Sequence, residues 1–237
     1  MSFPLTIIIP VYNEADNIRS ALDRIEAEVR TPHRVLIVYD IDEETTIPVV
    51  KKMQMTAHTI VLVKNKYGRG VLNAIKTGLE EAISTFVVVT MADLSDPPNV
   101  INDMYTIAVE KNADIVCASR YMKGGRQIGG PVIKSFLSRT AGLSLHYFAG
   151  LPTHDATNNF KLYRTSFLKT QTIESTGGFE LGLELVVKAH RHGGTICETP
   201  TSWTDRTAGK SNFKLLAWLG NYLKWFFYAF SATNRRS

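Results

Sequence analysis

The sequence has little cysteine, no low-complexity segment and no internal repeat. Its two cysteines, Cys117 and Cys197, both lie within apolar runs that are typical of buried strands. So few cysteines exclude a disulfide framework, and we expect free thiols in a reducing compartment. Glycine and proline are scattered rather than clustered into a linker. With 237 residues and 44% apolar content, the chain is predicted to bury one large core.

The N-terminal segment, MSFPLTIIIPVYNE, also lacks the features of a signal peptide. It has no basic stretch and no small-residue cleavage site, and its apolar run is too short to span a bilayer. We therefore expect a chain that begins with a strand in the cytosol.

Acidic residues are absent after Asp205. The basic residues beyond it outweigh the net charge of +5 of the whole chain; they are Arg206, Lys210, Lys214, Lys224, Arg235 and Arg236. The basic character therefore belongs to the tail. This distribution argues against a nucleic-acid partner and favours a local anionic partner, such as a phosphate or a charged membrane face.

Continuous apolar runs alternate with helical periodicity along the first half of the chain. Apolar runs predict strands, and apolar residues spaced three or four apart predict helices. Strands are predicted at 5–11, 34–39, 59–63, 86–90 and 113–118, and helices at 17–29, 71–83 and 99–111. This order predicts an α/β fold with a Rossmann-like, mostly parallel sheet and helices on both faces.

The alternation weakens after residue 130. A helix is predicted to begin at Pro131, another covers 182–192, and a strand at 195–198 leads into the basic loop DRTAGKSN. The last predicted helix, 213–230, places Lys214, Asn221 and Lys224 on one narrow face, with Leu, Trp and Phe over the rest.

We interpret 212–231 as an amphipathic helix that lies in a membrane interface, with Trp218, Tyr222 and Trp225 at headgroup depth and 232–237 as a basic tail. The alternative is a terminal helix packed on the protein or on a sister subunit.

Three predicted strands end in polar side chains. The first is followed by Tyr12 and Glu14, the second by Asp40 and Asp42, and the fourth by Asp93. In a parallel sheet these ends share one edge, where ligands bind. An aromatic ring and carboxylates suit a nucleobase and ribose, and Asp93 is suited to hold a divalent cation against a diphosphate, because Mg²⁺ prefers hard oxygen ligands.

Six short motifs follow one another in the chain: PVYNE, YDID, ADLSDPP, ASRYMKGG, NNFKLYR and DRTAGKS. Each is weak alone, but in this order and on strand ends they resemble the landmarks of the inverting GT-A glycosyltransferases of family two. Within that family the resemblance is greatest to dolichyl-phosphate mannose synthases and related polyprenyl-phosphate glycosyltransferases. It covers residues 4–212 and implies a GT-A catalytic domain over 1–211.

The resemblance also implies roles for individual residues. Those expected to bind the donor nucleoside are Pro10, Tyr12, Glu14 and Asp40, with Asp42 nearby, and Ala92 and Asp93 fall in the metal and diphosphate loop. Arg120 and Arg206 match phosphate-binding arginines and, with Asp93, are the expected catalytic residues. Lys134 and Ser138 match the site where a lipid phosphate docks.

The chain departs from the family pattern in its metal loop. The family usually reads Asp-Ala-Asp there, whereas this chain has Met91-Ala92-Asp93, with Ser95 where an amide is common. A thioether does not replace an oxygen ligand for Mg²⁺. Mg²⁺ or Mn²⁺ is therefore expected to be held more weakly, by Asp93 with Asp96 or the donor phosphates. On the closing loop Lys210 stands two positions before Asn212, where a lysine is often found.

The implied reaction moves a hexose, mannose or glucose, from a GDP- or UDP-linked donor to a polyprenyl phosphate at the cytosolic face of a membrane. A hydroxyl acceptor is the alternative, and it would need a general base, for which the candidates are Asp155, Glu180 and Glu184. Lys134, Ser138 and Arg139, near the start of a helix, favour the phosphate. A non-catalytic protein that binds nucleotide sugars is a further alternative, motivated by Met91.

Overall fold

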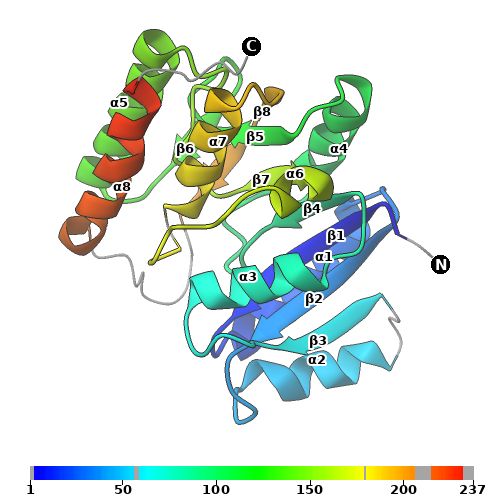
Figure 1. Cartoon of the computed structure of the whole chain (residues 1–237). Helices are drawn as coiled ribbons and strands as arrows, with labels where there is room; N and C mark the ends of the chain where they lie inside the picture. Colours follow the sequence, from blue (N-terminus) through cyan, green and yellow to red (C-terminus); the bar gives the residue numbers. More distant parts are fainter. Residues whose placement is uncertain (1–2, 56–58, 179, 206–214, 232–237) are drawn as a thin grey trace.

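The structure is a computed structural model that describes residues 3–55, 59–178, 180–205 and 215–231. Within these residues, seven strands form one sheet (Figure 1). Their order across the sheet is β3 (Ile60–Lys64), β2 (His33–Tyr39), β1 (Leu5–Val11), β4 (Phe86–Val89), β7 (Lys161–Arg164), β5 (Ile115–Ser119) and β8 (Ile196–Pro200). All run parallel except β7, which confirms the predicted α/β fold.

Helices cover both faces of the sheet and bury it. One face packs against α1 (Ala15–Glu28), α2 (Thr46–Gln54) and α4 (Val100–Glu110), and the other against α3 (Val71–Glu81) and α7 (Leu181–Arg191). Because both faces are covered, β1 is buried at every position, as its unbroken apolar run predicts. Gly78 of α3 lies so close to β1 that a Cβ there would stand 2.6 Å from Ile8 Cγ2.

The sequence analysis missed several short elements. The antiparallel strand β7 lies within the motif NNFKLYR and places Lys161 between Val89 of β4 and Cys117 of β5. The others are α2, α6 (Thr165–Lys169), and the pair β6 (Arg126–Ile128) and β9 (Ser202–Thr204). Elements of three to five residues are too short for a period to emerge, and in α2 the apolar residues from Ile47 to Val50 are consecutive rather than spaced three or four apart.

Cys117 is buried and Cys197 is partly exposed, and both are free thiols in the described part of the chain, as predicted.

Two long helices stand beside the sheet: α5 (Val132–Ala149) and α8 (Leu215–Phe230) (Figure 1). In α8, Trp225 is 2% exposed and packs into the core. Asn221 donates to Glu180 at 3.2 Å, and Lys224 pairs with Glu174 at 3.0 Å. Thus α8 turns this polar face toward the protein, and the placement of Trp225 and Tyr222 at headgroup depth was wrong, because both rings contact the core.

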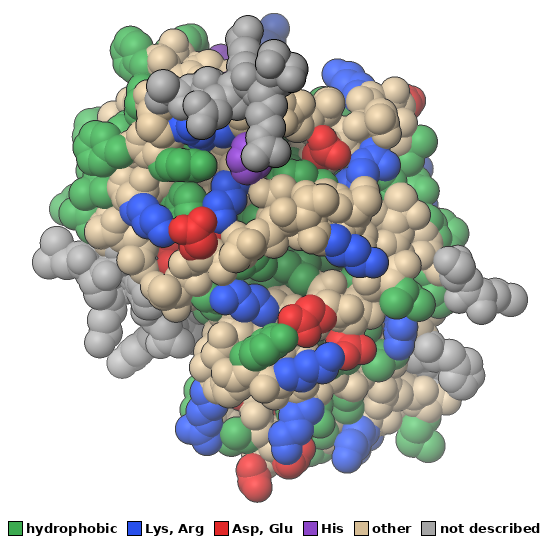
Figure 2. Space-filling model, in the orientation of Figure 1, with side chains coloured by type: hydrophobic (Ala, Val, Ile, Leu, Met, Phe, Trp, Pro, Cys, Tyr) green, Lys and Arg blue, Asp and Glu red, His purple; other side chains and the backbone are tan. Residues whose placement is uncertain are grey.

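The outward face of α8 is apolar and lies beside exposed apolar residues of α5. These residues are Leu219, Leu223, Phe227 and Phe230 on α8, and Val132, Ile133, Phe136, Leu137, Tyr147 and Phe148 on α5. Figure 2 shows hydrophobic side chains along this edge of the molecule, at the upper left. Within the described ranges, none of the helices has the length and hydropathy needed to cross a membrane.

Candidate active site

The loop after β1 presents Tyr12 and Glu14 at the carboxyl edge of the sheet. Between them Asn13 has a positive φ of 57°, a conformation that asparagine tolerates better than most residues. The Tyr12 ring is 54% exposed and available for stacking, and Glu14 accepts a hydrogen bond from Asn17 Nδ2 at 2.8 Å. Pro10 is buried within β1, so a donor could meet its backbone but not its ring.

Asp40 and Asp42 follow β2 at the same edge but have different partners. Asp40 accepts hydrogen bonds from Asn65 Nδ2 at 2.7 Å and from the N–H of Gly70 at 3.0 Å. It thereby anchors the glycine-rich loop before α3. The exposed Asp42 pairs with Lys64. The expected acidic residues are therefore together at the edge, and Asp40 positions a second loop there as well.

The loop after β4 carries the expected metal ligand, Asp93. Its Oδ1 accepts the N–H of Ser95 at 3.1 Å, and Leu94 between them has a positive φ of 61°, which is uncommon for a branched residue. Ala92 is 2% exposed and offers no side chain to a ligand. This tight turn places the carboxyl groups of Asp93 and Asp96 near each other.

Two buried polar atoms of this loop have no hydrogen-bond partner among the described residues: Ser95 Oγ and Asp96 Oδ1. Burial raises the pKa of Asp96 to about 7, and the nearby charge of Asp93 acts in the same direction. Two neighbouring carboxylates with an unsatisfied buried oxygen fit a divalent cation in part. In the described part of the chain, no group of three or more His, Cys, Asp or Glu could hold a metal ion.

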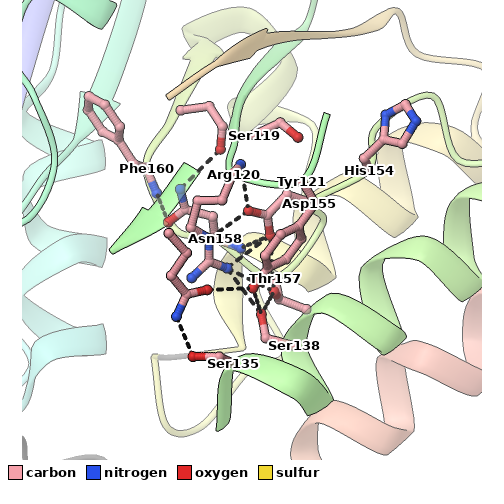
Figure 3. Close-up of polar contacts among 12 residues, drawn as sticks. Ser119, Arg120, Tyr121, Ser135, Ser138, His154, Asp155, Thr157, Asn158 and Phe160 are labelled. Atoms are coloured by element: carbon pink, nitrogen blue, oxygen red, sulfur yellow. Dashed lines mark hydrogen bonds and ion pairs between the residues drawn. The ribbon is translucent and has the colours of Figure 1, made fainter. Parts of the chain in front are cut away.

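Arg120, at the end of β5, is held by a buried carboxylate. Its Nε lies 2.7 Å from Asp155 Oδ2 and one Nη lies 3.0 Å from Asp155 Oδ1 (Figure 3). Burial raises the pKa of Asp155, but the charge and hydrogen bonds of Arg120 outweigh burial and leave it below its usual value. Arg120 was predicted to face phosphates, and the structure adds a partner that fixes its orientation.

The same guanidinium group reaches α5. Arg120 donates to Ser138 Oγ at 3.1 Å, and Ser138 Oγ also lies 3.0 Å from the Tyr121 hydroxyl and 2.6 Å from Thr157 Oγ1 (Figure 3). The structure thus brings together Arg120 and Ser138, which the sequence analysis had assigned to two different phosphates. Lys134, one turn before Ser138, is partly exposed.

A close approach of backbones makes this contact possible. A Cβ on Gly142 of α5 would stand 2.4 Å from the carbonyl oxygen of His154, in the loop that carries Asp155. A contact under 3.0 Å with backbone cannot be relieved by a side-chain movement. Glycine at this position therefore lets α5 lie against the site.

The three candidate bases all have structural partners. Asp155 is paired with Arg120, and Glu184 accepts from the N–H groups of Glu174 and Ser175 at 2.7 and 2.8 Å and pairs with Lys188 at 2.7 Å. Glu180 Oε1 accepts from the N–H groups of Thr176 and Gly177. Arg206 and Lys210, expected on the closing loop, lie outside the described residues.

A family model described as Glycosyl transferase family 2 matches residues 6–171. The chain belongs to glycosyl transferase family 2. The resemblance carried by the ordered motifs predicted this family.

Two curated relatives share about a quarter of its residues. A dolichol-phosphate mannosyltransferase of Pyrococcus furiosus is 25% identical over 89% of this chain and 59% of its own length. A polyprenol monophosphomannose synthase of Mycolicibacterium smegmatis is 26% identical over 86% and 79%. The chain thus spans less than two thirds of the first of these relatives.

Solved structures share the fold of this chain. A mannosyltransferase from Pyrobaculum calidifontis in complex with GDP-Man and Mn²⁺ has a TM-score of 0.67 at 18% identity, covering 96% of this chain and 64% of that one. Glucosyl-3-phosphoglycerate synthase from Mycobacterium tuberculosis, in complex with Mn²⁺, UDP-Glc and phosphoglyceric acid, has a TM-score of 0.71 at 13% identity, covering 96% and 79%. These likenesses confirm the GT-A fold.

Sequence reasoning missed several residues of the candidate site. Tyr121 donates to Gln127 Oε1 at 2.9 Å, and Gln127 donates to Ser135 at 2.5 Å, which extends the network along α5. Lys161 is fully buried at the same edge, and burial lowers its pKa. The position of Lys161 within NNFKLYR was a usable signal, because a lysine inside an apolar strand motif needs a buried partner.

Proposed function

We propose that this glycosyltransferase moves a hexose, mannose or glucose, from a nucleotide-diphosphate sugar to a polyprenyl phosphate at the cytosolic surface of a membrane. The names of the two curated relatives support this acceptor class and favour mannose. The neighbour solved with GDP-Man supports a guanosine donor, and the one solved with UDP-Glc supports a uridine donor.

The observation that carries the proposal is the composition of the first half of α5. Ser138 contacts Arg120 at 3.1 Å, and Lys134 lies one turn earlier. The exposed apolar side chains of Ile133 and Leu137 adjoin Lys134 and Ser138 in the sequence of the same helix. A cationic and hydroxylic site bordered by apolar surface matches a phosphate joined to a hydrocarbon chain.

The donor would lie along the carboxyl edge of the sheet. Tyr12 offers an exposed ring for the base, and Glu14 and Asp40 offer carboxylates for the base or ribose. The diphosphate would then extend toward the loop of Asp93, between that loop and Arg120. This order follows from the strand order β2, β1, β4, β7 and β5.

A divalent cation would be held by Asp93 with Asp96 and by oxygens of the donor diphosphate. When bound, such a cation offsets negative charge on the leaving diphosphate. Met91 contributes no oxygen, so Arg120 carries more of that charge than in relatives with another carboxylate. Asp155 keeps the guanidinium group oriented for this role.

The chemistry is an inverting displacement at the anomeric carbon. A phosphate oxygen of the acceptor forms the new bond to that carbon, while the bond to the donor diphosphate breaks and its electron pair leaves with the nucleoside diphosphate. A monophosphate with a second pKa of about 6 is already ionised at neutral pH, so no base has to remove a proton. The structural partners of Asp155, Glu180 and Glu184 agree with a reaction that needs none.

A polyprenyl phosphate acceptor lies at a membrane surface, because its hydrocarbon chain is in the bilayer. The exposed apolar residues of α5 and α8, together with the basic residues after Asp205, support binding to an anionic lipid surface. We propose that α8 contributes its apolar outer face while its polar face stays bonded to the protein. The boundary between a catalytic domain over 1–211 and a membrane-interface helix over 212–231 remains a prediction.

A panel of labelled donors tests the proposal. GDP-mannose, UDP-glucose and their relatives are incubated with a short polyprenyl phosphate, with Mg²⁺ or Mn²⁺, and with a chelator as control. We expect label in the organic phase with one donor and its loss with the chelator. Label in a water-soluble product would favour a hydroxyl acceptor. Nucleotide binding without any transfer would favour a non-catalytic protein.

A further inference from the structure

Glu44 is a buried carboxylate that the proposed chemistry does not use. It follows β2, four residues after Asp40, and is 1% exposed. Burial of an acidic side chain is unfavourable unless hydrogen bonds compensate for the lost water. Glu44 belongs to the loop that carries Asp40 and contacts the loop that carries Tyr12, and this position indicates its role.

Glu44 joins the loop after β1 to the loop after β2. Its Oε1 accepts the N–H of Asn13 at 2.6 Å and the hydroxyl of Thr46 at 2.5 Å. The Thr46 hydroxyl oxygen in turn accepts the N–H of Glu14 at 2.9 Å. One buried carboxylate thus holds two consecutive N–H groups of the β1 loop, one directly and one through a threonine.

These bonds act on the turn that exposes Tyr12. Asn13 has the left-handed backbone at φ 57°, and its N–H points to the carboxylate. Such a conformation persists when surrounding contacts stabilise it. The Asn13 side chain adds a second link, because its Oδ1 accepts the N–H of Thr45 at 3.3 Å. Without these links the ring of Tyr12 and the carboxylate of Glu14 would not be held in one relative position.

A contribution to folding stability does not by itself explain why a carboxylate occupies position 44. Its Oε2 is buried without a hydrogen-bond partner among the described residues, and burial raises the pKa of Glu44 above its usual value. An unsatisfied buried oxygen reduces stability. The neighbouring Glu14 and Asp40 are acidic as well, so the site concentrates like charges.

We propose that Glu44 is a positioning residue for donor binding: through Asn13 and Thr46 it fixes the two loops that contact the nucleoside. This inference rests on the proposed function, because it requires that the edge near Tyr12 binds a nucleotide. It predicts that Glu44 affects donor affinity far more than acceptor affinity or the rate at saturating donor.

The test is calorimetry of GDP and UDP, each with Mg²⁺, on the full chain. Glu44→Ala removes the acceptor and should weaken binding of the preferred nucleotide about tenfold or more, as expected for the loss of a hydrogen bond to a charged group. Glu44→Gln keeps an acceptor oxygen for Asn13 and Thr46 and should stay within about threefold of the wild type. Glu43→Ala, an exposed neighbour with the same charge, should leave binding unchanged.

Kinetics separate positioning from a general loss of structure. For Glu44→Ala, KM for the donor should rise while KM for the polyprenyl phosphate and kcat change little. Where this variant does not fold, Thr46→Val removes the hydroxyl that holds Glu14 and should also raise the donor KM.

Three results would overturn the inference. A folded Glu44→Ala protein with wild-type affinity excludes a positioning role. Equal losses in Glu44→Ala and Glu44→Gln would mean that charge, not hydrogen-bond geometry, matters. If the wild type bound neither nucleotide, the proposed function itself would fail, and the inference with it.

Discussion

Arg120 and Asp155 lie 35 positions apart in the chain and form a bidentate ion pair, with Nε 2.7 Å from Oδ2 and one Nη 3.0 Å from Oδ1. The carboxylate is fully buried and the guanidinium group is nearly so. A cation fixed in this way is preorganised to meet an anion, because its orientation is set before the ligand arrives. Its contact with Ser138 connects the expected donor phosphates to the expected acceptor site.

Breaking this pair should be costly. Asp155→Asn leaves a buried guanidinium group without its countercharge, and we expect a loss of about 3–5 kcal/mol in the free energy of unfolding. Chemical denaturation measures it. Glu81→Gln, which breaks the exposed pair with Lys66, is the matched control and should cost about 1 kcal/mol or less. Similar small losses for both would contradict the importance of the buried pair.

The pair also predicts how stability depends on pH. The pKa of Asp155 in the folded protein lies below its usual value of 3.8, because Arg120 outweighs the effect of burial. The contribution of the pair is therefore fully present above that value and is lost as pH falls through the lower folded pKa. Denaturation midpoints measured from pH 6 downward should fall more steeply for the wild type than for Asp155→Asn. Parallel curves would contradict this.

Met91→Asp should strengthen metal binding. The substitution adds an oxygen ligand two residues before Asp93, where relatives usually carry one. We expect the Mn²⁺ concentration for half-maximal activity to fall about tenfold, as one added carboxylate contact would give. Met91→Leu keeps an apolar side chain and should behave like the wild type. If both variants respond to Mn²⁺ alike, position 91 does not face the cation.

The exposed aromatic residues of α5 should contribute to lipid binding. Phe136 is 67% exposed and Phe148 is 79% exposed, so the double variant Phe136→Ser with Phe148→Ser should fold normally. Flotation with vesicles containing anionic lipid should show at least tenfold weaker binding, because each buried aromatic ring adds about 1.5–3 kcal/mol. Ile83→Ser, which is equally exposed but remote from α5, is the control. Equal flotation of all three proteins would exclude this surface.

Trp225→Ala tests whether α8 is part of the folded protein. The ring is buried, and the Nζ atoms of Lys188 and Lys224 lie 4.9 and 4.5 Å from its centroid. Its removal should lower the free energy of unfolding by about 3–5 kcal/mol. Phe227→Ala on the exposed face of the same helix should cost much less. An unchanged stability for Trp225→Ala would mean that α8 separates from the core.

Many features of the fold and of the candidate site could be predicted from local sequence patterns. The strand over residues 5–11 was predicted to the residue, because a fully buried strand of a parallel sheet is apolar throughout. Asp93 could be placed at the sheet edge because strand ends are visible as a change from apolar to polar residues. The inward polar face of α8 could not be predicted, because Asn221 and Lys224 acquire partners in the segment before α7 only after folding.

The sequence by itself therefore determined the alternating elements, the family and the edge of the sheet at which the chemistry lies. Periodicity and strand ends are local properties, and neighbouring residues suffice to define them. Only the tertiary structure decided that Asp155 holds Arg120, that Glu44 joins two loops and that Lys161 is buried between strands. These contacts depend on which distant segments the topology brings together. They also depend on the low dielectric constant of the protein interior, where one charged partner can determine whether a side chain is ionised.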